Sequence, residues 1–165
     1  AELAKVADHL DGRVICHNIA LGEFNDSSKM FVIAGSRDAS SLLRHNRLYD
    51  EVVFSGKAPA VAPQDVMVAA LDDYVLEKGL PLPDVVKLDV QGYEDRVLRG
   101  GRETVAAAKF CIVEASFEPF YEQSALFDDI YLLMRGYGFR LVGINNPACG
   151  YSIPQLQVNA LFKKS

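Results

Sequence analysis

The chain has 165 residues, of which 50% are hydrophobic, and a formal net charge of −5. This length suits a single domain over residues 1–165, and the acidic balance disfavours general nucleic-acid binding, which needs a basic surface. No apolar run reaches the roughly 18 residues of a membrane span and no signal peptide is visible, so the sequence predicts a soluble, cytoplasmic protein. The three cysteines lack metal-site spacing, and we expect no metal.

The first half of the chain predicts short elements separated by loops. Residues 3–10 have the apolar spacing of a helix that Gly12 ends, and strands are expected over residues 13–20, 29–33 and 65–70, with a turn at 25–28. Residues 34–63 read as irregular, with at most a short strand over 52–54. Residues 72–78 predict a helix closed by Gly79.

Five polar side chains of the irregular stretch are candidates for lining an acceptor site: Arg37, Ser40, Ser41, Arg44 and His45. A solvated loop with no specific role is an equally good interpretation of this stretch.

The rest of the chain is organised around residues 83–114. An apolar, β-branched run over 85–90 follows a Pro-Asp turn and predicts a buried strand. A helix is expected over 93–99, a second helical piece runs on to residue 108, and residues 110–114 predict another strand. Strand, helix and strand within about thirty residues predict a βαβ unit with parallel strands.

Three acidic residues of this unit are candidates for chemistry. Asp89 and Glu114 stand at or near the carboxyl ends of the two predicted strands, where open α/β sheets bind ligands. Glu94 falls in the first helical turn, where a carboxylate also suits the positive end of the helix. Each has a structural alternative, since Asp89 could cap the following turn and Glu114 could form an ion pair.

The last third of the chain predicts a lid, a helix and two strands. Residues 115–121 form an aromatic loop that could cover a substrate or pack as a plain lid. Residues 127–137 have the spacing of a core-facing helix. Strands are expected over 139–144 and 155–162, the last as an antiparallel edge, with a turn at 145–150 between them.

The segment Val-Val-Lys-Leu-Asp-Val-Gln-Gly-Tyr-Glu-Asp-Arg-Val-Leu-Arg-Gly-Gly at 85–101 resembles the signature of the FkbM family of S-adenosylmethionine-dependent methyltransferases. Ile-Ala-Leu-Gly at 19–22 and Leu-Asp-Asp-Tyr at 71–74 also resemble pieces of that family. Two positions depart from its pattern: Gln91 replaces a more usual Glu, and Gly101 a frequent Ala. Without a carboxylate, Gln91 is an unsuitable general base.

The resemblance implies an α/β fold, a Rossmann-like class I methyltransferase sheet that is mostly parallel with an antiparallel C-terminal strand. It implies S-adenosylmethionine as cofactor and O-methylation of a hydroxyl on a sugar or small natural product as the reaction. The residues it points to are Asp89, Glu114 and Glu94 for catalysis, and Asn18, Ala20, Leu21, Asp89 and Val90 for cofactor binding.

The family's glycine-rich loop and first two strands are not found in this sequence, which predicts N-terminal truncation. Their absence would leave a gap in the sheet between the strands predicted at 13–20 and 85–90. Strand exchange in a homo-oligomer, or a sheet that closes differently, are the alternatives. Two other functions stay open: a non-catalytic methyltransferase-like remnant or interaction module, and a nicotinamide-binding Rossmann domain, which ranks low because its fingerprint is absent too.

Overall fold

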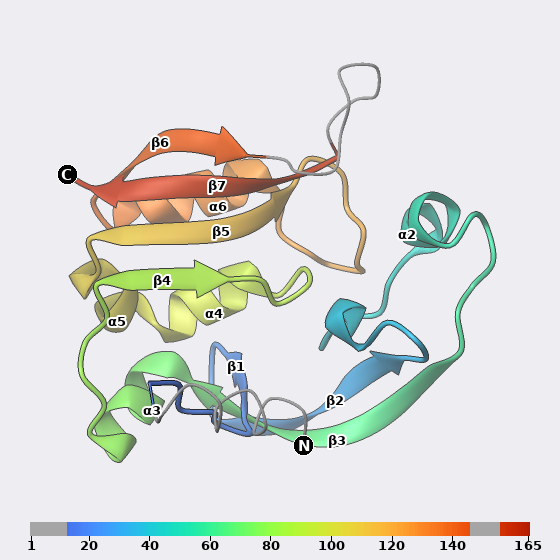
Figure 1. The fold of residues 1–165 in the computed structure, drawn as a ribbon, viewed down its shortest axis with the longest axis horizontal. Helices are drawn as coiled ribbons and strands as arrows, with labels where there is room; N and C mark the ends of the chain where they lie inside the picture. The colour runs from blue at the N-terminus through green and yellow to red at the C-terminus, as the bar shows by residue number, and fades with distance from the viewer. Residues whose placement is uncertain (1–12, 146–155) are drawn as a thin grey trace.

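The computed structural model describes residues 13–145 and 156–165, which form two mixed sheets and their helices (Figure 1). The helix predicted over 3–10 and most of the turn predicted at 145–150 lie outside these residues. The strand orders are β1-β3-β2 and β4-β5-β7-β6. The α/β class is therefore confirmed, whereas a mostly parallel sheet is not what these strands form.

The first sheet consists of β1 (Ala20–Gly22), β2 (Asp26–Ile33) and β3 (Val61–Ala70). β3 is central and pairs parallel with β1 and antiparallel with β2. The prediction of a strand over 13–20 was wrong in its bounds, because only Ala20 to Gly22 gain a hydrogen-bonded partner. The turn predicted at 25–28 was also misplaced, since Asp26 already pairs with Val68 and the bend lies at 23–25.

The stretch predicted as irregular contains the short 3-10 helix η1 (Arg37–Ala39) and the helix α2 (Arg47–Val53). The short strand considered over 52–54 was wrong. Asn46 caps α2, because its side-chain oxygen accepts the backbone N–H of Tyr49 at 3.1 Å. Tyr49 is buried among aromatic side chains, so the cap and this burial together favour a helix.

The second sheet consists of β4 (Val85–Leu88), β5 (Phe110–Ser116), β6 (Phe139–Asn145) and β7 (Gln157–Lys164). β4 and β5 are parallel, as predicted for the βαβ unit. β7 is antiparallel to both β5 and β6 and lies between them. The last strand is therefore internal, and the prediction that it forms an edge was wrong.

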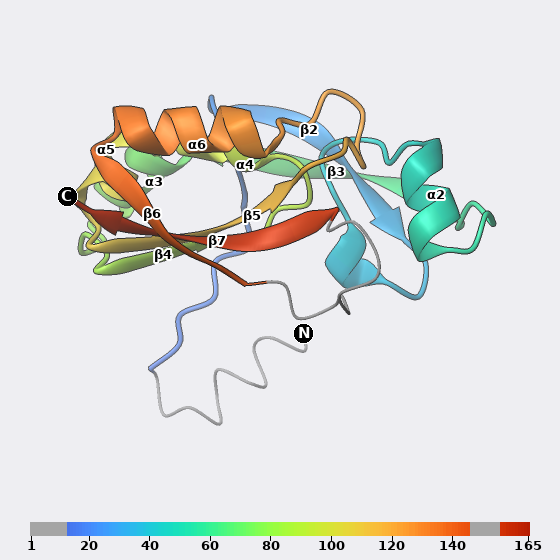
Figure 2. The same cartoon turned by 90° about the horizontal axis from the view of Figure 1, so that it is seen from above.

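Two helices cover one face of the second sheet. α4 (Glu94–Gly100) and α6 (Phe127–Gly136) lie on the same side of it (Figure 2), while α3 (Leu71–Lys78) and α5 (Arg102–Ala107) lie nearer its end. α3 ends at Gly79, whose left-handed backbone (φ 60°) confirms the predicted stop. The main core lies between helices and sheet and includes Val97, Leu98, Val113, Met134, Phe139 and Phe162.

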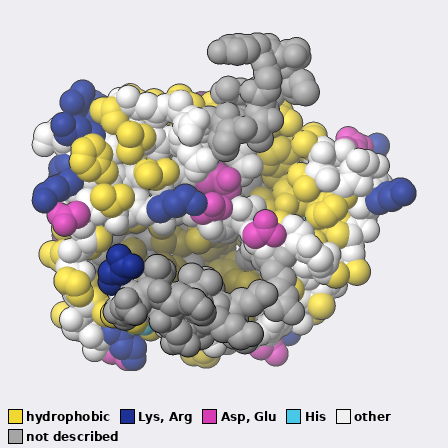
Figure 3. Space-filling view, viewed as in Figure 1, with side chains coloured by type: hydrophobic (Ala, Val, Ile, Leu, Met, Phe, Trp, Pro, Cys, Tyr) yellow, Lys and Arg dark blue, Asp and Glu magenta, His cyan; other side chains and the backbone are white. Residues whose placement is uncertain are grey.

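The opposite face of the second sheet is uncovered within the described residues. Along β5, Cys111, Val113 and Ala115 are buried, whereas Ile112 and Glu114 alternate toward the other side. Figure 3 shows that side, where hydrophobic side chains gather over β5, β6 and β7 and charged side chains lie toward the middle. The carboxyl group of Glu114 therefore belongs to the open side of the sheet.

No strand of one sheet pairs with a strand of the other in the described part of the chain, although residues 44–46 form backbone hydrogen bonds with residues 120–122. Among the described strands, β1 pairs only with β3, and β4 only with β5. α4 packs against β1 so closely that a Cβ added at Gly100 would lie 2.0 Å from the carbonyl oxygen of Gly22. The gap predicted between these strands is thus present in this part of the chain.

Candidate functional site

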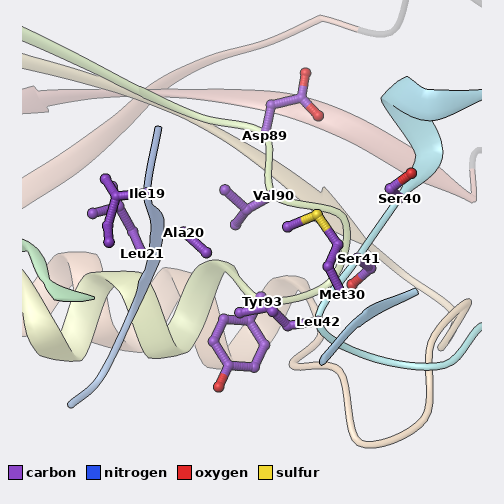
Figure 4. Close-up of a pocket in the computed structure, with 10 residues that line it drawn as sticks. All are labelled: Ile19, Ala20, Leu21, Met30, Ser40, Ser41, Leu42, Asp89, Val90 and Tyr93. Atoms are coloured by element: carbon purple, nitrogen blue, oxygen red, sulfur yellow. The ribbon is translucent and has the colours of Figure 1, made fainter. Parts of the chain in front are cut away.

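A cavity of about 270 Å³ lies where the two sheets meet. Its walls come from β1 and the residue before it, from β2, from the loop after η1 and from the segment that follows β4 (Figure 4). The lining residues are Ile19, Ala20, Leu21, Met30, Ser40, Ser41, Leu42, Asp89, Val90 and Tyr93. The wall is mostly apolar, and its polar side chains are Asp89 and the hydroxyl-bearing Ser40, Ser41 and Tyr93.

Asp89 directly follows β4 and lies beside a lysine. Lys87 donates to Oδ2 of Asp89 at 2.8 Å, and Gln91 donates to Oδ1 at 2.9 Å. Partial burial opposes ionisation of this carboxyl, but the hydrogen bonds from Lys87 and Gln91 outweigh it and lower the pKa of Asp89. Asp89 is therefore a carboxylate at neutral pH.

Glu114 stands on the adjacent strand and has the opposite tendency. Burial, followed by the negative charge of Asp89, raises the pKa of Glu114 to about 8. The two carboxyl groups interact directly, so that at neutral pH Glu114 holds a proton while Asp89 stays ionised. The structure thus brings together the first two predicted catalytic residues.

Gln91 joins the two carboxyl groups. Its Nε2 lies 2.9 Å from Oδ1 of Asp89 and 3.1 Å from Oε2 of Glu114, so one amide donates to both. The backbone of Gln91 is left-handed (φ 57°), which is uncommon for a residue with a side chain. From the sequence, Gln91 was judged only as a general base, and its role as a hydrogen-bond donor was missed.

Tyr121 fixes the other end of the Gln91 amide. Its hydroxyl donates to Oε1 of Gln91 at 2.7 Å. Its ring packs against Gly92, where an added Cβ would lie 2.8 Å from a ring carbon. Burial and the neighbouring Tyr49 raise the pKa of Tyr121, so its hydroxyl stays protonated. Tyr121, at the end of the aromatic loop after β5, therefore supports the hydrogen-bonded Asp89–Gln91–Glu114 network from the protein interior.

Glu94 is buried, and its carboxyl group accepts hydrogen bonds from the backbone after β4 instead of lining the cavity. Its Oε1 accepts the N–H groups of Val90 at 3.0 Å and Gly92 at 3.3 Å. Burial raises the pKa of Glu94 to about 7. This geometry matches the structural alternative that the sequence left open for Glu94.

The cavity also gathers most of the predicted cofactor-binding residues. Ala20, Leu21, Asp89 and Val90 line it, whereas Asn18 lines a separate hollow beside it. Of the polar loop set, Ser40 and Ser41 reach the cavity. Two others have local partners instead: Arg44 lies over the ring of Phe31 and His45 lies 3.0 Å from Asp50.

Comparison with known proteins decides the family. Residues 7–141 match the model of the methyltransferase FkbM domain, which is most of the chain. The chain belongs to the FkbM methyltransferase family. FkbM methyltransferases use S-adenosylmethionine, as the resemblance implied.

A curated relative of this FkbM chain is the 2-O-methyltransferase NoeI of Sinorhizobium fredii (strain NBRC 101917 / NGR234). The two are 37% identical over 78 residues, which is 47% of this chain and 30% of the relative. The match thus spans less than a third of the curated relative. No solved structure shows a significant match to the chain.

The residues around the cavity fit part of S-adenosylmethionine. Apolar walls at Ile19, Leu21 and Val90 suit its uncharged parts, and the Asp89 carboxylate complements its positive charge. The volume of about 270 Å³ lies just below the roughly 300–1,000 Å³ of small-molecule sites. The described residues could therefore line one side of the cofactor but do not enclose it.

Residues 13–145 and 156–165 lack two other features. Within these ranges, no three or more His, Cys, Asp and Glu side chains group so as to hold a metal ion. None of the helices there is long and apolar enough to cross a membrane.

Proposed function

We propose that this FkbM protein methylates a hydroxyl group on a sugar or small natural product, with S-adenosylmethionine as methyl donor. The observation that carries this proposal is the meeting of the Asp89 and Glu114 carboxyl groups at the ends of β4 and β5, beside the cavity. The name of the relative, a 2-O-methyltransferase, supports an oxygen acceptor.

The finer fold belongs to the same proposal. We infer one methyltransferase-like domain with a Rossmann-like class I sheet, of which β4-β5-β7-β6 form one half. The parallel β4–β5 pair with its α4 crossover, and an antiparallel β7 beside it, support that arrangement.

The chain's own residues have to position the acceptor and receive its proton. When bound, S-adenosylmethionine supplies an activated methyl group. As the acceptor oxygen gains a methyl group, its hydrogen must leave as a proton. Asp89, ionised at neutral pH, would accept the hydrogen bond of the acceptor hydroxyl and then receive its proton, beside the already protonated Glu114.

Other residues of the cavity would have supporting roles. Ala20, Leu21 and Val90 would form the apolar wall against the cofactor, and Asn18 would contact it from the adjoining hollow. Glu94 would hold the segment after β4 in place through its two backbone contacts. We therefore assign Glu94 to positioning rather than to proton transfer.

Methyl transfer tests the proposal directly. The full-length protein would be incubated with S-adenosylmethionine carrying a labelled methyl group and a panel of saccharides and hydroxylated natural products. We expect label in at least one acceptor as an alkali-stable ether, and a loss of about 100-fold or more in kcat for Asp89→Asn.

The matched control for this experiment is Asp84→Asn. Asp84 also pairs with a lysine at 2.8 Å, but it is exposed and precedes β4, at the opposite end of that strand from Asp89. Its variant should keep full activity. A full-length protein that neither binds the cofactor nor labels any acceptor would support the non-catalytic remnant instead.

A further inference from the structure

We propose that Gln91 is a positioning residue that holds Asp89 and Glu114 in one orientation, and that Tyr121 sets the direction of the Gln91 amide. The proposal rests on the proposed function for its catalytic meaning. It concerns a position that has no reactive group of its own.

The hydrogen bonds fix which end of the amide faces the carboxyl groups. The NH₂ group of Gln91 has two hydrogens, and Asp89 and Glu114 each receive one contact, at 2.9 and 3.1 Å. Its oxygen accepts from Tyr121 at 2.7 Å. A flipped amide would turn its oxygen toward Asp89 and Glu114 and lose both of these donated hydrogen bonds.

The backbone of Gln91 is held as firmly as its side chain. Ser41 is buried, and its hydroxyl donates to the carbonyl oxygen of Gln91 at 2.6 Å. The left-handed φ of 57° at Gln91 is followed by φ 90° at Gly92. The surrounding contacts therefore maintain a backbone conformation that a free chain would rarely adopt.

The charges around Gln91 explain why a neutral donor suits this position. Five titratable groups face one another here: Lys87 on β4, Asp89 directly after it, Glu114 on β5, Glu94 on α4 and Tyr121 after β5. Three of them are carboxyl groups and one is a cation. A glutamate in place of Gln91 would add a fourth carboxyl group and remove both donors.

Carbon-13 NMR titration of the side-chain carboxyl groups tests this without any methyl transfer. In Gln91→Met, which keeps the length but has no donor, we expect the pKa of Asp89 to rise by about one unit, because its ionised form loses a hydrogen bond. In Tyr121→Phe we expect a smaller rise, because the amide is then free to turn over.

Matched controls separate this effect from general loss of structure. Gln123 shares the left-handed backbone (φ 61°) but is exposed, so Gln123→Met should leave the pKa of Asp89 unchanged. Tyr131→Phe, on α6, is the control for Tyr121→Phe. If Gln91→Met does not fold, Tyr121→Phe decides the question alone.

Activity then gives the second measurement. In the full-length protein, Gln91→Met should lower kcat about 10-fold or more, with the pH profile displaced and the KM for S-adenosylmethionine nearly unchanged. Unchanged carboxyl pKa values in both Gln91→Met and Tyr121→Phe would overturn the proposal. Displaced pKa values in a protein without any methyl transfer would uphold the positioning of the carboxyl groups and contradict the proposed function alone.

Discussion

One carboxylate oxygen of Glu94 accepts the backbone N–H of Val90 at 3.0 Å, and this contact ties the first turn of α4 to the segment after β4. The same oxygen also accepts from Gly92 at 3.3 Å. Val90 and Gly92 flank Gln91, so the buried Glu94 supports the segment from which Asp89, Val90 and Gln91 face the site.

Removal of the Glu94 side chain should therefore destabilise the fold. Glu94→Ala leaves two backbone N–H groups buried without an acceptor, which should lower the free energy of unfolding by about 3 kcal/mol. Glu94→Gln keeps an acceptor oxygen and should lose much less. Urea denaturation measures both, with Glu77→Ala on the exposed side of α3 as the control, expected within about 0.5 kcal/mol of wild type.

A methyl group at position 100 should also destabilise the protein. A Cβ there would lie 2.0 Å from the carbonyl oxygen of Gly22, a backbone atom that cannot move aside without displacing β1. Gly100→Ala should lower the free energy of unfolding by about 3 kcal/mol or more. At Gly136, the last residue of α6, nothing lies within 4 Å of the added Cβ, so Gly136→Ala should be neutral or slightly stabilising.

The titration of Glu114 should make stability depend on pH. Its pKa is raised from 4.5 to about 8 in the folded state, so the folded protein holds a proton that the unfolded chain has released. The stabilisation of the folded state by this proton is complete below about pH 4.5 and is lost as the pH rises through about 8. Glu114→Gln should remove it and flatten the stability profile over this range.

Thermal unfolding at several pH values measures this effect. Glu94, with its pKa raised to about 7, acts in the same direction over a narrower range, so Glu114→Gln leaves a residual fall in stability between about pH 4.5 and 7. Identical profiles for wild type and Glu114→Gln would be incompatible with a raised pKa at Glu114.

The reactivity of the cysteines should show whether the core is packed as the structure has it. Cys111 on β5 is fully buried, and burial raises the pKa of its thiol to about 12, so it should resist alkylation by iodoacetamide at pH 8 until the protein unfolds. Cys16 is exposed and should be modified in the native protein. Peptide mass mapping distinguishes the two sites. Fast native labelling of Cys111 would show that the core is not packed as described.

Local patterns in the sequence were sufficient to predict the βαβ unit of residues 83–114. The β-branched run that became β4, the glycines around α4 and the apolar β5 predicted a parallel pair, and the structure has it. Asp89 and Glu114 were predicted to stand at or near the carboxyl ends of these two strands, and because parallel strands end at the same edge of a sheet, the structure brings them together. These inferences needed only contacts between neighbouring elements.

The errors arose where a partner distant in sequence determines the structure. The strand predicted over 13–20 is cut to Ala20–Gly22 because β3, some fifty residues later, is its partner. α2 depends on the burial of Tyr49 against Phe120 and Tyr121. Gln91 was missed for the same reason, since its role depends on two carboxyl groups and a tyrosine that no local pattern brings together.

Titration calorimetry with S-adenosylmethionine tests the central claim most directly. The full-length protein should bind the cofactor, and Leu42→Trp, which fills the cavity from a loop, should weaken binding at least about 10-fold, while Leu132→Trp on the exposed side of α6 should not. Absence of binding by the full-length protein, or equal affinity in wild type and Leu42→Trp, would contradict the placement of the cofactor in this cavity.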